Sequence, residues 1–123
     1  MNIAPFNVEV ESLDGGVGVF SISGELDQST AAELREPLHE AINGGTAAVM
    51  IDMTKCGFID STGLGVIVEA WKMLKERNGN DAGLSICCAE PEVTRLLELT
   101  GLDQAIVIRD TREEAIAALR VEA

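Results

Sequence analysis

The chain contains 123 residues, about the length of one domain and enough to bury a core without metal ions or disulfide bonds to support it. Its 21 acidic side chains against 9 lysines and arginines give a formal net charge of −12 at pH 7, which repels nucleic acids and anionic lipids. Aromatic residues make up only 3% of the chain, too few for a base-stacking surface or a sugar-binding platform. Nucleic-acid binding, membrane binding and glycosidase activity are therefore disfavoured.

The same composition indicates a reduced, cytoplasmic protein. The sequence has no run of about eighteen uncharged apolar residues, and its N-terminus lacks the basic start and apolar middle of a signal peptide. The 3 cysteines are an odd number without Cys-x-x-Cys spacing, and with a single histidine the chain offers few ligands for a zinc site. We expect free thiols, no metal and no cofactor. For Cys87 and Cys88 at the end of a strand, the two interpretations are burial and redox sensing, and burial is favoured.

The first predicted elements form a β-hairpin. Val8 and Val10 alternate with polar residues, as in a half-buried strand, and residues 17–23 supply a second apolar run. Asp14-Gly15-Gly16 between them has the composition of a turn. Two adjacent strands joined by so short a turn are antiparallel.

A helix and a buried strand follow. Thr30-Ala31-Ala32-Glu33 fits a capping box, and apolar residues then recur at helical spacing as far as Ile42. Pro37 is expected to kink this helix without ending it. Residues 47–51 form a continuous apolar run that ends at Asp52, which is the pattern of a central strand covered on both faces.

The second half of the chain alternates helices and strands. Helical spacing, short apolar runs and a second capping box predict, in order, a helix over 61–78, a strand over 84–88, a helix over 91–100, a strand over 106–108 and a helix over 111–119. Pro91 suits the first turn of its helix, and Gly101 is placed to stop it.

The resulting order, ββαβαβαβα, predicts a single α/β domain over residues 1–123 with its core between about 6 and 119. The sheet is expected to be mixed, beginning with the antiparallel hairpin and continuing through β-α-β crossovers, with about four helices. No repeat or linker interrupts this pattern.

The stretch from Lys55 to Val66, KCGFIDSTGLGV, is the strongest candidate for a functional motif. Its glycines follow a strand and open a helix, where phosphate groups can bind, but a Walker loop needs a Gly-Lys-Ser/Thr ending and a dinucleotide fingerprint needs a third glycine. A serine nucleophile needs a base, and the only histidine, His39, falls on the first helix as a solvated residue. The pattern Gly-x-Ser-x-Gly is also absent. Nucleotide binding and hydrolysis are therefore disfavoured.

Asp60, Ser61 and Thr62 are three potential caps for one helix end. Because one end does not require three caps, at least one hydroxyl is left to face outward. Gly63 would let another part of the backbone approach closely, and we expect Gly65 to serve close packing of the helix.

Three landmarks together resemble the anti-sigma factor antagonists of the STAS domain family. They are Gly24-Glu25-Leu26-Asp27, the apolar strand ending in Asp52, and Phe58-Ile59-Asp60-Ser61-Thr62-Gly63-Leu64-Gly65. The likeness runs from about Phe6 to Leu119, and the core of the third landmark is specific for the family. The resemblance implies that Ser61, the hydroxyl directly after the motif aspartate, is phosphorylated, and that the chain is a substrate and not an enzyme.

The resemblance further implies partner switching that controls transcription through a sigma factor. The unphosphorylated antagonist would bind an anti-sigma factor that is also a serine kinase of the GHKL ATPase fold, and phosphorylation would release it; a PPM-type phosphatase would reset the cycle. Asp27 and Asp60 are implied as neighbours of the hydroxyl, and Thr62, Gly63 and Leu64 as parts of the docking surface. The alternative is a STAS subunit of a signalling scaffold or a phospholipid-transport complex, without a phosphate cycle.

Overall fold

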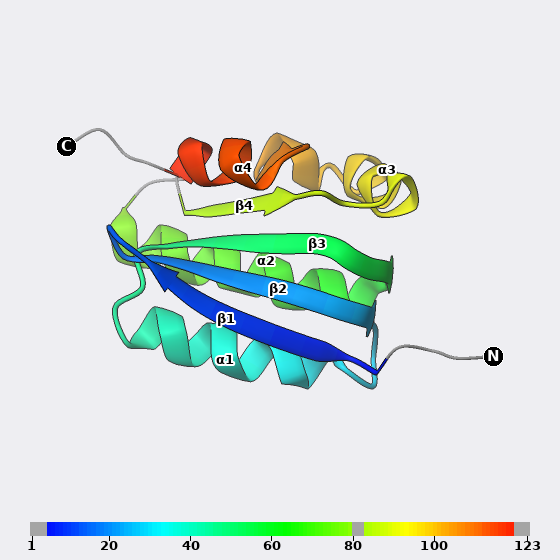
Figure 1. The fold of residues 1–123 in the computed structure, drawn as a ribbon, viewed down its shortest axis with the longest axis horizontal. Coiled ribbons are helices and arrows are strands. Elements are labelled where there is room, and N and C mark those ends of the chain that lie inside the picture. The colour runs from blue at the N-terminus through cyan, green and yellow to red at the C-terminus, as the bar shows by residue number, and fades with distance from the viewer. Residues whose placement is uncertain (1–4, 80–82, 120–123) are drawn as a thin grey trace.

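The computed structural model of the chain describes residues 5–79 and 83–119. Within them, five strands form one mixed sheet in the order β1-β2-β3-β4-β5 (Figure 1). β1 pairs antiparallel with β2, and the other neighbours are parallel. The strands are β1 (Asn7–Leu13), β2 (Val17–Leu26), β3 (Ala48–Ile59), β4 (Leu84–Cys87) and β5 (Val107–Arg109). The helices are α1 (Ala31–Asn43), α2 (Ser61–Asn78), α3 (Pro91–Leu99) and α4 (Arg112–Leu119), with a 3₁₀ turn η1 (Leu102–Gln104). The predicted fold class and order of elements are confirmed.

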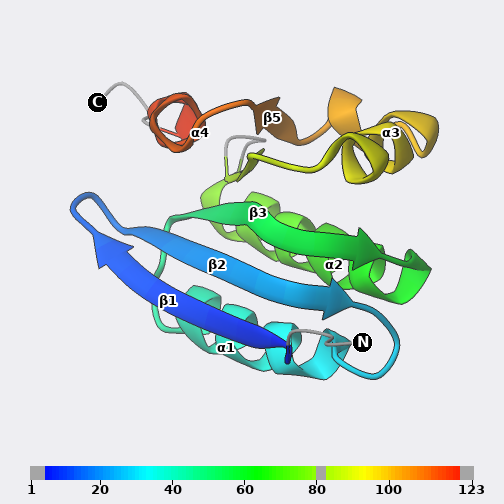
Figure 2. The ribbon, with the colours of Figure 1, turned by 45° about the vertical axis from the view of Figure 1, so that its right-hand side comes forward.

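The sheet carries helices on both faces, because successive strand side chains point to opposite sides. On one face, Phe20 of β2 and Ile51 of β3 belong to the main core, which includes buried residues of α1, α2 and α3. On the other face, Val19 and Met50 form a smaller core with Leu119 of α4. α1 and α2 lie side by side behind β1 to β3, whereas α4 lies near β4 (Figures 1 and 2).

β3 is longer than predicted. The apolar run ends at Asp52, but the strand continues to Ile59 because it keeps pairing with β2, which itself reaches Leu26 instead of stopping near Ser23. Polar residues and a glycine break the apolar pattern in this second half, and shifts of register make the pairing irregular. The extension sets the ends of β2 and β3 side by side.

One of the two predicted capping boxes is wrong. Thr30 precedes α1, but its hydroxyl accepts a hydrogen bond from the N–H of Asp27 at 2.9 Å and donates to the carbonyl of Glu25 at 2.7 Å, so it does not cap the helix. At the start of α4, Thr111 Oγ1 does accept from the N–H of Glu114 at 3.1 Å. Local sequence therefore identified both helix starts but only one of the caps.

Two prolines and a glycine occupy the positions in and around the helices that the sequence predicted. Pro37 lies inside α1, which continues past it to Asn43, and Pro91 is the first residue of α3. Gly101, beyond the end of α3, has a φ of 79°, the left-handed conformation that glycine adopts most easily.

A single arginine ties α4 to the sheet. Arg112, the first residue of α4, donates from Nη2 and Nε to Oδ2 of Asp52 at 3.0 and 3.2 Å, and from Nη2 to Ser21 Oγ at 3.1 Å. Asp52 is only 9% exposed. Burial alone would raise the pKa of Asp52, but hydrogen bonds from Thr54 together with Arg112 bring that pKa below its ordinary value. The carboxylate is therefore ionised at neutral pH.

Replacing Arg112 by alanine is expected to lower the free energy of unfolding at neutral pH by about 1 to 2 kcal/mol, because a buried carboxylate loses its cation; a fully buried pair would cost more. Because the pKa of Asp52 is lowered, the stability contributed by its pairing is complete above the unfolded pKa of about 3.9 and is lost as the pH falls through the folded value. Urea unfolding of both proteins at neutral pH and in acid measures the difference. A difference that stays constant in acid would contradict this assignment.

Candidate functional site

Two loops meet at the carboxyl ends of β2 and β3. The strands are parallel neighbours, so Leu26 at the end of β2 pairs with Ile59 at the end of β3. The N–H of Asp60 then donates to the carbonyl of Leu26 at 3.2 Å. The loop between β2 and α1 and the junction between β3 and α2 therefore share one surface, at the end of the sheet where both strands finish (Figure 1).

Asp60 links these two segments. Its Oδ1 accepts a hydrogen bond from the N–H of Gly63 at 3.0 Å and so caps α2, while its Oδ2 accepts from the N–H of Gln28 in the other loop at 3.0 Å. The sequence left three candidate caps, and the structure selects Asp60. Both carboxylate oxygens are engaged by backbone N–H groups from different segments.

The hydroxyls of Ser61 and Thr62 are therefore not used as caps and are exposed. Ser61 and Thr62 are the first residues of α2 and are exposed, and within the described part of the chain neither hydroxyl is hydrogen bonded to another residue. Ser61 lies in the first helical turn, where unpaired N–H groups and the positive end of the helix dipole favour negative charge. An exposed hydroxyl on a rigid helix start is chemically suited to receive a phosphoryl group.

Asp27 fixes the shape of the first loop. Its Oδ1 accepts from the N–H and the hydroxyl of Ser29 at 2.9 and 2.8 Å, and from the N–H of Thr30 at 3.2 Å. The Ser29 hydroxyl, with these backbone bonds, keeps the pKa of Asp27 below its ordinary value, so the carboxylate is ionised at neutral pH. The structure brings Asp27 and Asp60 to adjoining segments, and their action on Ser61 remains a prediction.

The two glycines of the motif have different environments. A Cβ on Gly63 would lie 2.7 Å from both Cγ and the carbonyl oxygen of Leu26, so this position needs glycine for the close approach that the sequence predicted. A Cβ on Gly65 would meet nothing within 4 Å. The expectation that Gly65 serves close packing of the helix is therefore wrong, since Gly65 is exposed. Leu64 is only 7% exposed, so it could contribute to docking only indirectly, by packing α2 against the core.

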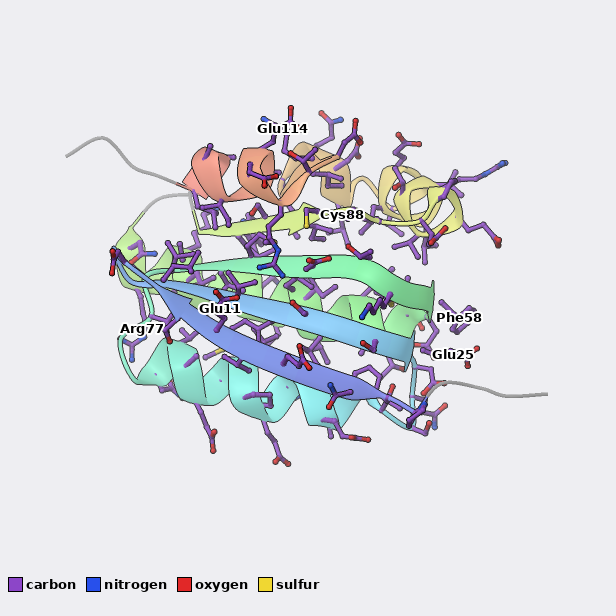
Figure 3. The ribbon with its side chains drawn as sticks, viewed as in Figure 1. Glu11, Glu25, Phe58, Arg77, Cys88 and Glu114 are labelled. Atoms are coloured by element: carbon purple, nitrogen blue, oxygen red, sulfur yellow. The ribbon has the colours of Figure 1, made fainter. Side chains whose placement is uncertain are left out.

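An exposed apolar patch beside the motif was missed by the sequence analysis. Phe58 is 47% exposed and Leu99 is 74% exposed, and both line a groove between the end of β3 and α3. Phe58 also borders a shallow depression that includes Asp27 and Asp60. Figure 3 shows Phe58 and Glu25 at this end of the sheet. Phe58 lies within the motif, two residues before Asp60, but its exposure depends on irregular strand pairing that the sequence does not show.

The chain does not place its histidine beside Ser61. His39 on α1 shares a hydrogen bond with Glu69 of α2 at 3.0 Å, and Arg35 contacts the same carboxylate at 3.5 Å. Glu69 is eight residues along α2 from Ser61, a rise of about 12 Å at about 1.5 Å per residue. The histidine is therefore not placed to act as a base for Ser61.

Comparison with known proteins agrees with this geometry. A profile of the STAS domain matches residues 7–115 of the chain. The chain belongs to the STAS domain family. An anti-sigma F factor antagonist of Paenibacillus polymyxa is 33% identical over 107 residues, covering 86% of this chain and 89% of that protein.

Solved structures show the same STAS fold. An anti-sigma factor antagonist from Mycobacterium paratuberculosis matches with a TM-score of 0.84 and 29% identity, covering 95% of this chain and 96% of that chain. SpoIIAA of Bacillus in its phosphorylated form has a TM-score of 0.72 and 23% identity over 93% of this chain and 100% of that chain, a likeness of fold alone. These relatives of the STAS domain are named for regulation and not for catalysis. Among the described residues, no helix has both the length and the apolar character needed to cross a bilayer.

Changing Asp60 to alanine in this STAS domain is expected to reduce the free energy of unfolding by about 1 to 2 kcal/mol, because α2 loses its cap and the N–H of Gln28 loses its acceptor. Asp60→Asn is the matched control, since asparagine caps helices about as well as aspartate and retains one acceptor oxygen. We expect it to cost about half as much in chemical denaturation. Equal losses for the two variants would show that charge, and not the cap, matters at this position.

Proposed function

We propose that this chain is an anti-sigma factor antagonist whose partner binding is switched by phosphorylation of Ser61. The observation that carries the proposal is the exposed Ser61 hydroxyl at a helix start that Asp60 already caps. The relatives named anti-sigma factor antagonists support the same role. The solved forms of SpoIIAA, unphosphorylated and phosphorylated, are consistent with a domain of this fold that accepts a phosphoryl group.

The surroundings of Ser61 would tolerate the modification within the domain. A phosphoryl group adds about 1.5 to 2 negative charges and three acceptor oxygens. The N–H groups of the first turn of α2 face that charge, and the helix dipole stabilises it by about 0.3 to 1 kcal/mol. The Asp60 bonds to Gly63 and Gln28 leave the hydroxyl free to react without breaking the helix cap. Phosphorylation should therefore change the surface much more than the fold.

The partner we propose is an anti-sigma factor that is also a serine kinase of the GHKL ATPase fold, with a PPM-type phosphatase to remove the phosphate. The docking surface would comprise the start of α2 and the exposed Phe58 beside it. Gly65, with open space where a side chain would lie, permits a partner to approach the helix closely. A phosphate at this contact would face the kinase's own nucleotide phosphates, and about 1.4 kcal/mol of repulsion lowers affinity tenfold.

The proposal is tested by incubating the chain with ATP and candidate GHKL kinases, followed by intact mass and peptide mapping. We expect one phosphate, on Ser61, and none in Ser61→Ala. Thr62→Ala is the matched control, because Thr62 is the exposed neighbour in the same helical turn, and it should still be phosphorylated. Phosphate on Thr62, or neither phosphorylation nor binding with any such kinase, would overturn the proposal.

A different outcome would favour the alternative of a permanent STAS subunit. In that case the chain binds a partner stably, is not phosphorylated, and binds equally well as Ser61→Glu and as wild type. A partner is first captured with the wild-type chain, and its affinity for the Ser61 variants is then measured. The comparison distinguishes the two roles, since only a switch depends on the charge at position 61.

A further inference from the structure

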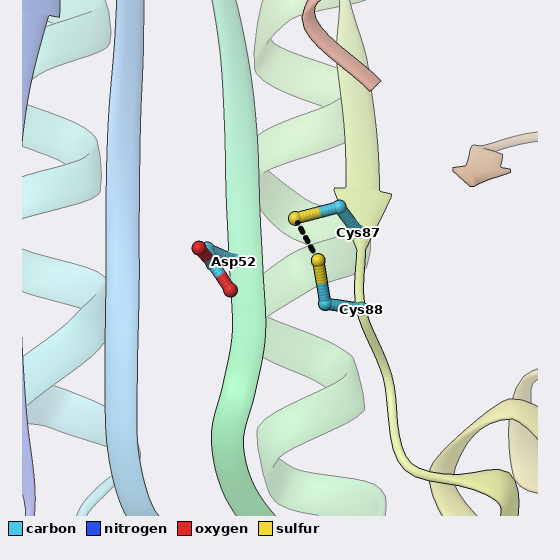
Figure 4. Close-up of side chains that lie close together, drawn as sticks. All are labelled: Asp52, Cys87 and Cys88. Atoms are coloured by element: carbon cyan, nitrogen blue, oxygen red, sulfur yellow. Dashed lines mark hydrogen bonds between the residues drawn. The ribbon is translucent and has the colours of Figure 1, made fainter. Parts of the chain in front are cut away.

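Two neighbouring thiols lie against each other at the end of β4. Cys87 is the last residue of β4 and Cys88 follows it, and the Cys88 thiol donates a hydrogen bond to Cys87 Sγ at 2.9 Å (Figure 4). We call these two residues the dithiol pair. Cys87 is fully buried and Cys88 is half-buried. The third cysteine, Cys56, is buried in the main core, away from the pair.

The backbone puts both thiols on the same side of the chain. Successive side chains of a strand point to opposite faces, which would separate two neighbouring cysteines. Cys88 has a φ of 65°, in the left-handed region, and its N–H donates to the carbonyl of Arg109 at 3.1 Å. A residue other than glycine in this conformation is uncommon and strained. Among the described residues, Cys88 is the only one apart from glycine with a positive φ.

The dithiol pair lies beside Asp52 of the neighbouring strand β3, which is paired with Arg112 of α4. A carboxylate oxygen of Asp52 and both sulfurs are within 4.8 Å of one another, a spacing that a metal ion would also accept. Asp52, however, already bonds Arg112 at 3.0 Å, and the guanidinium would repel a cation at this place. Burial also raises the pKa of Cys87, so Cys88, the more exposed thiol, is the better first nucleophile. Chemistry between the two sulfurs fits these surroundings better.

We propose that Cys87 and Cys88 form a redox site that a hydroperoxide closes to a vicinal disulfide and a small dithiol reopens. The sulfur of Cys88, the thiol within reach of solvent, attacks one oxygen of hydrogen peroxide; the O–O bond breaks, giving a sulfenic acid and water. Cys87 sulfur then attacks the Cys88 sulfur. The S–S bond forms, the S–O bond breaks, and hydroxide leaves with the Cys87 proton as a second water. Two thiols are oxidised and one peroxide is reduced.

The bond would be reversible for a geometric reason. Adjacent residues hold their Cα atoms about 3.8 Å apart, whereas ordinary disulfides join Cα atoms about 4.4 to 6.8 Å apart. A bridge closed over so short a span is strained, and strained disulfides are the more easily reduced ones. The site is on the sheet face that α4 covers, opposite α2 and Ser61, so it does not depend on the proposed phosphorylation.

The test uses the full chain, reduced and then treated with hydrogen peroxide before alkylation with iodoacetamide and tryptic mapping. Cleavage after Arg77 and Arg95 places both thiols in peptide 78–95, whereas Cys56 lies in peptide 56–72 and serves as an internal control. We expect peptide 78–95 to lose two hydrogens and accept no alkyl group, and to accept two alkyl groups after dithiothreitol. Cys56 should remain alkylated.

A reagent that binds two nearby thiols gives a second test of the dithiol pair. Phenylarsine oxide, which bridges two nearby thiols, should bind the reduced wild-type chain at one equivalent and protect both thiols, but bind neither Cys87→Ser nor Cys88→Ser. Circular dichroism checks that these variants are folded. If a variant is not folded, the binding and protection measured on the wild-type chain decide the test. Sulfinic acid at Cys88, a Cys88 disulfide between two chains, or an unoxidised peptide 78–95 under conditions that oxidise free glutathione would overturn the proposal.

Discussion

Replacing Ser61 by glutamate is expected to lower the affinity of this STAS domain for the proposed GHKL kinase by about a hundredfold or more, equivalent to two units of about 1.4 kcal/mol. The side chain is exposed at the start of α2, so the substituted carboxylate would lie in the interface and face the kinase-bound nucleotide phosphates. Ser61→Ala, which removes the hydroxyl without adding charge, should bind at least as tightly as wild type. Calorimetric titration with the kinase and ADP measures all three affinities.

The control for this prediction separates position from net charge. Ala117→Glu adds the same charge at an exposed position on α4, on the other face of the sheet from α2, and should leave the affinity unchanged. Raising the salt concentration should recover part of the Ser61→Glu loss, because the repulsion is screened over about 10 Å at 0.1 M salt. If Ala117→Glu weakened binding as much as Ser61→Glu, general repulsion by a chain of net charge −12 would explain the effect instead.

The elements of the fold follow from local patterns, whereas their ends and caps depend on partners distant in sequence. Helical spacing predicted α2 from Ser61 to Asn78 because the pattern is contained in the segment itself. The length of β3 was not predictable in this way, since its second half is held by pairing with β2. Thr30 looked like a cap, but Asp27 and Glu25 engage its hydroxyl in the loop before α1.

The site shows the same division. The order Asp60-Ser61-Thr62 located the helix start, but the sequence does not show that the Gln28 N–H of the neighbouring loop also binds the carboxylate of Asp60. The outward position of Gly65 was accessible from the sequence, because it shares a helical face with polar Glu69 and Lys72. The exposure of Phe58 was not, because it depends on the register shift in the pairing of β2 with β3 near Glu25.

Gly63→Ala and Gly65→Ala are expected to change stability in opposite directions, although both remove a glycine from the same helix. Alanine at position 63 would press a methyl group to 2.7 Å from the carbonyl oxygen of Leu26, a backbone atom that cannot turn aside. Overpacking of this kind costs about 1 to 3 kcal/mol, more than the helix propensity that alanine gains. We expect Gly63→Ala to lose about 2 kcal/mol.

At position 65 the new methyl group enters open space, so the gain in helix propensity, about 0.5 to 1 kcal/mol, remains. Thermal and urea unfolding of the two variants provide the comparison, and equal effects would show that the helix start is less tightly seated on Leu26 than its geometry indicates. Kinase binding adds a separate readout. Because Gly65 is exposed beside Ser61, Gly65→Ala should weaken docking while stabilising the fold, and that combination distinguishes a partner surface from a structural requirement.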